Sequence, residues 1–220
     1  LKPSDARQLN GARLVFWVGP NLEGFLVRPL SSLADTIRVV QLSAGGQSDD
    51  PHIWLDPRGA AAIVGKMVEA LAGVDATNRA RYEANGARMK AMLARLDREI
   101  FERLKPVAVV PYLVFHDAYR YFEKRFDLAS QGAVAVHEGR APGAKRIAML
   151  RRKIIDMNIA CVFTEPQFEP ALAKTLIEGT GARTAVLDPL GANLKPGPGL
   201  YPALMRGLVE QLLGCLGANG

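Results

Sequence analysis

The sequence predicts an α/β fold of two lobes, in which parallel sheets are flanked by helices and one long helix joins the lobes. After Pro106, short apolar segments alternate with helical patterns, which is typical of a parallel sheet covered by helices. Before it, one helical pattern runs through residues 76–105 and would be about 45 Å long at roughly 1.5 Å per residue. That length is too great for one small domain. We therefore expect an incomplete N-terminal lobe at 1–75, a linking helix at 76–105 and a C-terminal lobe at 106–220.

The elements of the N-terminal lobe follow from local patterns. Leu14–Val18 is a short apolar run that ends at a Gly-Pro pair, which predicts a strand and a turn. Asp56 and Pro57 form a helix start, with Asp as the N-cap and Pro at the first helical position. The other predicted elements are a helix at Leu22–Leu33, a strand at Ile37–Leu42, a loop at Ser43–Asp50 and a helix that Gly73 ends.

The C-terminal lobe is predicted to contain four strand–helix units in sequence. The apolar runs are short enough to be buried strands, and each is followed by a helical segment. The expected strands are Val107–Pro111, Ala133–Val136, Ile159–Thr164 and Thr184–Leu187, and the expected helices are Asp117–Phe126, Gly143–Asn158, Pro170–Gly179 and Tyr201–Leu216.

Charge and composition exclude several classes of protein. A net charge of +6 and a pI near 9.5 raise nucleic acid as a partner. However, the 28 basic residues are scattered among 22 acidic ones, and few aromatic residues accompany them to stack on bases. No apolar run reaches the roughly 18 residues of a membrane-spanning helix. No secretory signal is visible, and the opening Leu1–Asp5 resembles an interior segment.

The two cysteines, Cys161 and Cys215, both lie in apolar surroundings. They are either two buried thiols or one disulfide, and a disulfide would need an oxidising compartment. Their spacing does not decide between these alternatives. The absence of a CxxC pair argues against a structural zinc site built on cysteine.

Two of the three histidines and one aspartate occupy positions suited to metal binding. His52 ends a loop just before a helix, His116 follows an apolar strand, and Asp188 follows another strand. The carboxyl ends of strands line the ligand crevice in open α/β sheets, and zinc binds imidazole nitrogen and carboxylate oxygen. Each residue also has an ordinary explanation as a cap, turn or core hydrogen-bonding group. The third histidine, His137, is expected to be a solvated loop residue.

Several motifs in order along the chain resemble those of the cluster A-I, TroA-like metal-binding proteins of ABC transporters. DPHIWLDP at 50–57 is similar to the first family signature, and FHDAYRYF at 115–122 is similar to the second. FTEPQF at 163–168 and LDPLG at 187–191 resemble the third and fourth, and FWVGP at 16–20 also fits. The resemblance covers essentially the whole chain and is closest to the zinc-binding members.

This resemblance implies two α/β lobes joined by a rigid helix, with the metal bound in the cleft between them. It implies that His52 and His116 are ligands from the two lobes, and that Asp188 is a candidate carboxylate ligand. Manganese-binding members carry Glu where His116 stands. Because imidazole favours zinc, whereas carboxylate and water suit manganese, this position favours Zn²⁺. The resemblance also implies a further His ligand upstream of Leu1.

The resemblance further implies a periplasmic location and a membrane permease of a zinc ABC transporter as partner. The expected form is a monomer that binds no nucleic acid. Cys161 and Cys215 match the pair that zinc-binding members join in a disulfide. Zinc-binding members often carry a His-rich loop before the first signature, whereas Ser43–Asp50 has no His.

Other functions remain as alternatives to zinc uptake. A manganese or iron carrier and a surface adhesin would share the fold. A zinc hydrolase would need a general base, for which Asp117 and Glu165 are available. No HExxH motif is present, and Asp117 is expected to be a helix cap and Glu165 a structural strand-end residue, so we expect no enzyme.

Overall fold

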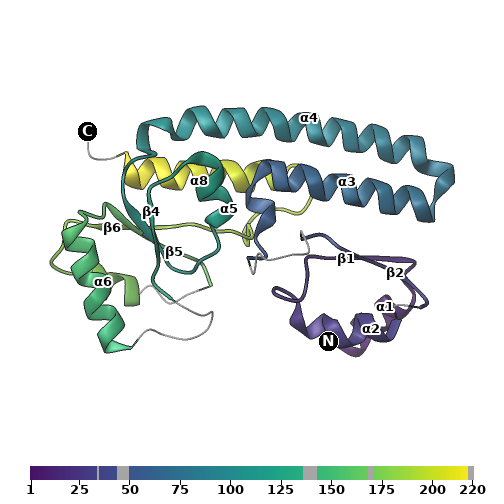
Figure 1. The fold of residues 1–220 in the computed structure, drawn as a ribbon, viewed down its shortest axis with the longest axis horizontal. Helices are drawn as coiled ribbons and strands as arrows, with labels where there is room; N and C mark the ends of the chain where they lie inside the picture. Colours follow the sequence, from purple (N-terminus) through teal and green to yellow (C-terminus); the bar gives the residue numbers. More distant parts are fainter. Residues whose placement is uncertain (34, 44–49, 136–142, 168–170, 218–220) are drawn as a thin grey trace. The chain divides into compact units, whose positions relative to one another are not determined.

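The computed structural model describes residues 1–33, 35–43, 50–135, 143–167 and 171–217. The chain has an α/β fold with parallel sheets flanked by helices, as the sequence predicts (Figure 1). It divides into two compact units, Leu1–Asp97 and Arg98–Gly220. The predicted long helix is confirmed as α4, Arg79–Leu104, whose 26 residues cross the boundary between the units. Within the described ranges, no helix has the length and apolar character needed to cross a membrane.

The first unit contains a two-stranded parallel sheet in which β1 pairs with β2. Leu14 lies opposite Arg38 and Trp17 opposite Gln41, so the two strands are in register over their whole length. The N-terminal helix α1 was not expected from the sequence, and the predicted helix at 22–33 begins with a 3₁₀ turn. The elements are α1 Pro3–Asn10, β1 Leu14–Trp17, η1 Gly24–Leu26, α2 Val27–Leu33, β2 Arg38–Gln41, η2 Ile53–Leu55, α3 Pro57–Val74 and η3 Ala76–Asn78.

Helix α3 begins as its sequence predicts. The side chain of Asp56 caps the helix by accepting a hydrogen bond from the backbone N–H of Arg58 at 2.8 Å. Gly59 lies in the first turn, where an added Cβ would clash with the carbonyl oxygen of Ile53. Only glycine therefore lets α3 approach the short helix η2, and η2 directly follows His52.

The second unit contains a four-stranded, all-parallel sheet with the strand order β4-β3-β5-β6. Figure 1 shows α6 on one side of this sheet and α5 and α8 on the other. Each connection between consecutive strands contains a helix, because parallel strands need a crossover. The elements are η4 Lys105–Val107, β3 Tyr112–Val114, α5 Arg120–Phe126, β4 Ser130–Ala133, α6 Ala144–Asp156, β5 Cys161–Thr164, α7 Ala171–Ile177, β6 Arg183–Val186 and α8 Leu200–Leu216.

The prediction of a strand at Val107–Pro111 is wrong. The 3₁₀ turn η4 ends there at the buried Val107, a further turn follows in which Val109 is 83% exposed, and the strand begins only at Tyr112. Two prolines bracket the run and withhold backbone N–H donors, so a sheet ladder starts after Pro111. Strand β4 likewise lies three residues earlier than predicted, at Ser130–Ala133.

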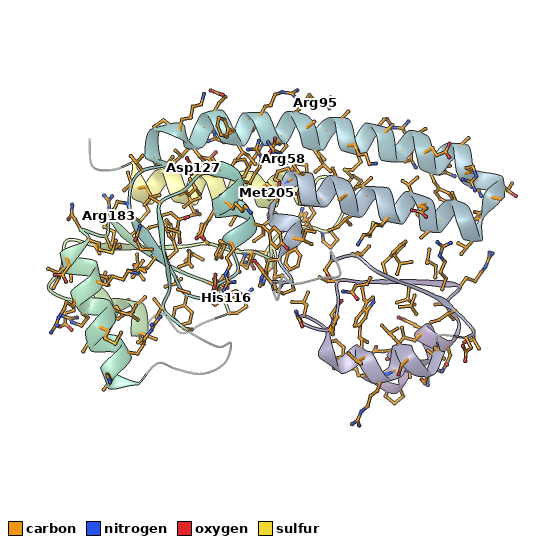
Figure 2. All side chains as sticks on the ribbon, in the orientation of Figure 1. Arg58, Arg95, His116, Asp127, Arg183 and Met205 are labelled. Atoms are coloured by element: carbon orange, nitrogen blue, oxygen red, sulfur yellow. A yellow bond between two sulfur atoms is a disulfide. The ribbon has the colours of Figure 1, made fainter. Side chains whose placement is uncertain are left out.

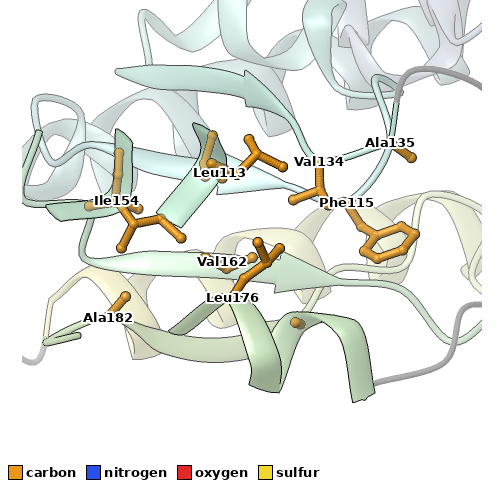
Figure 3. Packing of buried hydrophobic residues seen from close by; sticks show 11 residues of the cluster. Leu113, Phe115, Val134, Ala135, Ile154, Val162, Leu176 and Ala182 are labelled. Atoms are coloured by element: carbon orange, nitrogen blue, oxygen red, sulfur yellow. The ribbon is translucent and has the colours of Figure 1, made fainter. Parts of the chain in front are cut away.

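The two faces of this sheet are packed differently. Leu113 and Val162, from adjacent strands, point into a cluster with apolar residues of α6 and α7 (Figure 3). Tyr112 and Phe163 point to the opposite face, where their rings meet edge to face at 5.5 Å. Because successive side chains of a strand alternate between faces, both faces of these short strands are buried.

A disulfide joins Cys161 on β5 to Cys215 on α8 and confirms the pairing implied by the resemblance. The Cα atoms are 6.3 Å apart, and both residues are buried. The bond fixes the last helix to a central strand of the sheet. Near it, the guanidinium group of Arg183 donates a hydrogen bond to the carbonyl oxygen of Cys215, which adds a polar link between β6 and the same helix end.

The carboxyl group of Glu123 on α5 should destabilise the fold at neutral pH. Burial raises the pKa of Glu123 above its ordinary value of 4.5, while a hydrogen bond with Ser130 lowers it, as does one from the Tyr112 hydroxyl at 3.3 Å. A carboxyl whose pKa is raised on folding costs stability above its folded pKa, and that cost vanishes below 4.5. We therefore expect Glu123→Gln to raise the free energy of unfolding at pH 7. Urea denaturation should show the gain shrinking as pH falls towards 4.5; a less stable variant at pH 7 would contradict this reasoning.

Candidate metal centre

His52 is positioned by its own segment of the first unit. It immediately precedes η2 and is 6% exposed. One carboxylate oxygen of Asp50 accepts the backbone N–H of His52 at 2.9 Å and lies 2.8 Å from the ring nitrogen Nδ1. The ring of Trp54 lies beside the imidazole, with ring centroids 5.2 Å apart. The DPHIW motif thus fixes both the backbone and the ring of His52.

The ends of the two strands in this unit are also anchored by charged side chains. The carboxylate of Glu23 accepts hydrogen bonds from the backbone N–H groups of Val18 and Gly19, at 2.6 and 3.1 Å. The ammonium group of Lys66 on α3 donates to the carbonyl oxygens of residues 41–43, at 3.2, 3.0 and 2.9 Å. These contacts hold the carboxyl ends of β1 and β2. Most of the predicted loop at 43–50 lies outside the described residues.

In the second unit, polar residues follow three neighbouring strands at the same edge of the sheet. His116 lies two residues beyond β3, Glu165 one residue beyond β5, and Asp188 two residues beyond β6. Strands β3 and β5 pair in register, with Val114 opposite Phe163. Extending that register by two residues places His116 beside Glu165.

His116, which is labelled in Figure 2, forms a close buried pair with Glu165. The imidazole nitrogen Nδ1 lies 2.5 Å from a carboxylate oxygen of Glu165. The side chains are 11% and 2% exposed, respectively. The backbone beside the histidine is held as well, because the N–H of Ala135 donates to the carbonyl oxygen of Phe115 and the N–H of Ala118 to that of His116. The pair is therefore held by backbone contacts on both sides of the histidine.

Tyr119 links this pair to the end of β6. Its hydroxyl donates a hydrogen bond to the carbonyl oxygen of Leu187 at 3.2 Å. Burial raises the pKa of Tyr119 well above its ordinary value, and the neighbouring charge of Glu165 adds to this effect. The phenol therefore remains a hydrogen-bond donor throughout the neutral range. It ties the chain before Asp188 to the His116–Glu165 pair.

Asp188 organises the turn that follows β6. Its carboxylate accepts hydrogen bonds from the backbone N–H groups of Leu190, Gly191 and Ala192, at 3.0, 2.9 and 2.6 Å. Gly191 has a φ of 70°, a conformation that favours glycine in this turn. An ionised carboxylate offers about four lone-pair positions, and three N–H groups occupy most of them. Asp188 can therefore offer a metal ion one oxygen and not two.

Local contacts thus fix each predicted metal ligand in place. That the three ligands bind the same ion stays a prediction. Across the described ranges, no three His, Cys, Asp or Glu side chains gather so that they could hold a metal ion together. Asp117 is not the cap of α5, because Tyr119 occupies that position and the Asp117 carboxylate accepts from the Arg120 guanidinium at 2.7 Å. His137 lies outside the described residues.

Sequence comparison decides the family. A family model described as "ZnuA: Zinc-uptake complex component A periplasmic" matches residues 1–215. The chain belongs to the ZnuA family. A protein of Brucella abortus (strain 2308), named "High-affinity zinc uptake system protein ZnuA", is 38% identical over 98% of this chain and 80% of its own length. A Yersinia pestis protein of the same name is 33% identical over 98% of this chain and 79% of its own length.

Solved structures agree with ZnuA membership. A structure described as "Crystal structure of ZnuA" has a TM-score of 0.83 and 25% identity, covering 98% of this chain and 84% of its own. A laminin-binding adhesin of Streptococcus agalactiae has a TM-score of 0.82 over 96% of this chain and 85% of its own, but is only 21% identical, so it shows the fold alone. The ZnuA family consists of solute-binding proteins that act in zinc uptake with an ABC transporter permease. The hydrolase alternative is therefore excluded, and the expectation of a non-enzymatic protein is confirmed.

Two residues that contact the ZnuA candidate ligands were not recognised from the sequence as their partners. Asp50 lies in the DPH motif itself, two residues before His52, where an Asx-type turn is a local signal. Glu165 is 49 residues from His116 in sequence and was expected only to have a structural role at the end of a strand. The signal that could have revealed its partner is the shared sheet edge, since adjacent parallel strands bring their carboxyl ends together.

Proposed function

We propose that this chain captures Zn²⁺ in the periplasm, with His52, His116 and Asp188 as ligands, and delivers the ion to the permease of an ABC transporter. Membership of the ZnuA family supports zinc as the cargo, because the related proteins are named for high-affinity zinc uptake. The observation that carries the ligand assignment is the orientation of the histidines. In each, a buried carboxylate contacts Nδ1, which is the usual outer partner of a metal-binding imidazole.

The types of ligand favour zinc over manganese. Neutral imidazole nitrogen suits Zn²⁺, whereas Mn²⁺ prefers carboxylate, carbonyl and water oxygens. Two imidazoles and a single oxygen of Asp188 supply three ligands of a tetrahedral zinc site and leave one position for a further ligand. The turn around Asp188 supports the use of one oxygen, because backbone N–H groups engage the remaining acceptor positions.

The location and the remaining partners follow from the same reasoning. The Cys161–Cys215 disulfide supports an oxidising compartment such as the periplasm.

Several basic side chains are engaged with the chain's own backbone: Lys66, Arg146 and Arg151 all donate to backbone carbonyl oxygens. The positive charge is therefore partly structural, which supports the absence of a nucleic-acid partner. We propose that the carrier acts as a monomer, since a single copy supplies these ligands.

Substitution of His116 tests the ligand assignment. We expect His116→Ala to weaken zinc binding by more than about 100-fold, because loss of an outer-shell partner alone costs about 10- to 100-fold. His52→Ala should have a similar effect. Competition with a chromogenic zinc chelator measures the dissociation constant, and Mn²⁺ run in parallel measures selectivity. The third histidine supplies the matched control, His137→Ala, which should bind zinc as the wild type does. Unchanged affinity in His116→Ala would refute the assignment.

A further inference from the structure

Both predicted histidine ligands share one arrangement, although they come from different units of the chain. The Nδ1 atom of His52 lies 2.8 Å from Asp50, and that of His116 lies 2.5 Å from Glu165. In both pairs the carboxylate is almost fully buried, with side-chain exposures of 5% for Asp50 and 2% for Glu165. Buried carboxylates are rare unless they are paired, so each has a specific role in its surroundings.

The contacts favour one tautomer of each imidazole. A carboxylate oxygen within hydrogen-bond distance of Nδ1 accepts a hydrogen bond when that nitrogen carries the ring proton. In a neutral ring, a proton on Nδ1 places the lone pair on Nε2. A metal ion binds the nitrogen that carries the lone pair. Asp50 and Glu165 therefore select Nε2 of His52 and His116 as the metal-binding atom.

The two carboxylates also suit the charge of the cargo. Zn²⁺ bound only by neutral imidazoles would bring a double positive charge into a poorly solvated site, which is costly. Two buried carboxylates directly behind the imidazoles carry the opposite charge, and burial reduces screening of their attraction to the ion. Through the hydrogen bond, each carboxylate also makes its imidazole a stronger donor to the metal.

The two pairs arise in different ways. Asp50 also accepts the backbone N–H of His52, so that pair is preorganised by a local turn. Glu165 comes from another strand and reaches His116 only because β3 and β5 pair in register, with Val114 opposite Phe163. The ring of Tyr119, whose hydroxyl donates to the carbonyl oxygen of Leu187, lies next to the imidazole of His116, with ring centroids 6.4 Å apart.

We infer that Glu165 and Asp50 are positioning residues for zinc: they fix the Nδ1–H tautomer of His116 and His52 and balance the charge of the bound ion without ligating it. This inference rests on the proposed function, which identifies the two histidines as ligands. It assigns each carboxylate an effect on affinity that acts through an imidazole.

Three variants of the full chain test the role of Glu165. Glu165→Leu removes the acceptor at similar volume and should weaken zinc binding by about 10- to 100-fold. Glu165→Gln keeps an oxygen that can accept from Nδ1–H but removes the charge, so it should restore part of the lost affinity. Glu123→Gln makes the same carboxyl-to-amide change at a half-buried position elsewhere in the second unit and should leave zinc affinity unchanged. Chelator competition measures all three, and urea denaturation reports whether each variant is folded.

A spectroscopic measurement separates positioning from a general structural effect. Long-range ¹H–¹⁵N correlation spectra of the metal-free protein report which nitrogen of each histidine is protonated. The wild type should show His116 protonated at Nδ1, whereas Glu165→Leu should shift the ring towards the Nε2–H tautomer. Asp50→Asn should alter the pattern of His52 and leave that of His116 unchanged.

The outcomes distinguish this inference from the proposed function. If the wild type binds zinc and His116→Ala does not, but folded Glu165→Leu retains wild-type affinity and tautomer, the positioning role is wrong and the ligand assignment stands. If His116→Ala binds zinc as tightly as the wild type, the proposed function itself fails. If Glu165→Gln binds zinc as weakly as Glu165→Leu, the charge of Glu165 and not the tautomer of His116 determines the affinity. That result would overturn the inference that Glu165 acts by fixing the tautomer.

Discussion

Replacing Cys161 and Cys215 together with alanine should lower the free energy of unfolding by about 3 to 5 kcal/mol. The bond closes a segment with a sequence separation of 54 residues, and losing it enlarges the conformational freedom of the unfolded chain. In the loop-entropy description, the effect is about 3 kcal/mol for a 15-residue loop and about 4.7 kcal/mol for a 100-residue loop. Because both sulfurs are buried, alanine also leaves small gaps between β5 and α8.

Urea denaturation followed by circular dichroism measures this loss. The double variant should unfold at a lower urea concentration, and wild type unfolded in the presence of a strong reductant should match it closely. The agreement would show that the bond itself, and not the packing of the two side chains, supplies most of the stability. An unchanged midpoint in the double variant would contradict the expected contribution.

Phe163→Ala should destabilise the second unit by about 3 to 5 kcal/mol, the usual cost of removing a large aromatic core side chain. Phe163 is fully buried in β5, and its ring meets that of Tyr112 edge to face. The gap would open beneath a strand whose continuation carries Glu165. We therefore also expect weaker zinc binding, because β5 positions that carboxylate through its register with β3.

Two further substitutions give a scale against which the stability loss of Phe163→Ala can be compared. Phe163→Leu keeps most of the apolar volume and should lose less stability than Phe163→Ala. Val109→Ala changes a side chain that is 83% exposed and should alter the free energy of unfolding by no more than about 0.5 kcal/mol. Thermal and urea unfolding of the three variants give the ranking. If Phe163→Ala were no more damaging than Val109→Ala, the proposed importance of this face of the sheet would be wrong.

Local patterns predicted most elements of the fold, and tertiary context explains the exceptions. The alternation after Pro106 correctly indicated a parallel sheet, because each strand is short, apolar and separated from the next by a helix. The run at 107–111 has the same composition, yet prolines at its ends favour a turn, and Val107 is buried outside the sheet. Helix α1 has only eight residues, is polar on average and buries none of them, so it lacks the run of apolar residues by which the longer helices were predicted.

The candidate site was predictable as far as its motifs extend. His52, His116 and Asp188 each follow a recognisable strand end or loop end, and the resemblance to a family assigned them as ligands. The contact between His116 and Glu165 depends on which strands are neighbours and in which register, and neither is encoded locally. The turn around Asp188 was foreseen only as an ordinary alternative, although its three backbone contacts now limit how that carboxylate can act.

The position of His116, Glu165 and Asp188 just past the last paired residues of β3, β5 and β6 has an evolutionary consequence. Residues that build the sheet and the residues proposed to act on the ion are separate sets, so selection can alter one set without disturbing the other. A lineage could exchange an imidazole for another metal-binding group just past the carboxyl ends of these strands and acquire a new cargo while keeping the same fold. For protein engineers, the same positions are the natural place to change the metal preference of such a carrier.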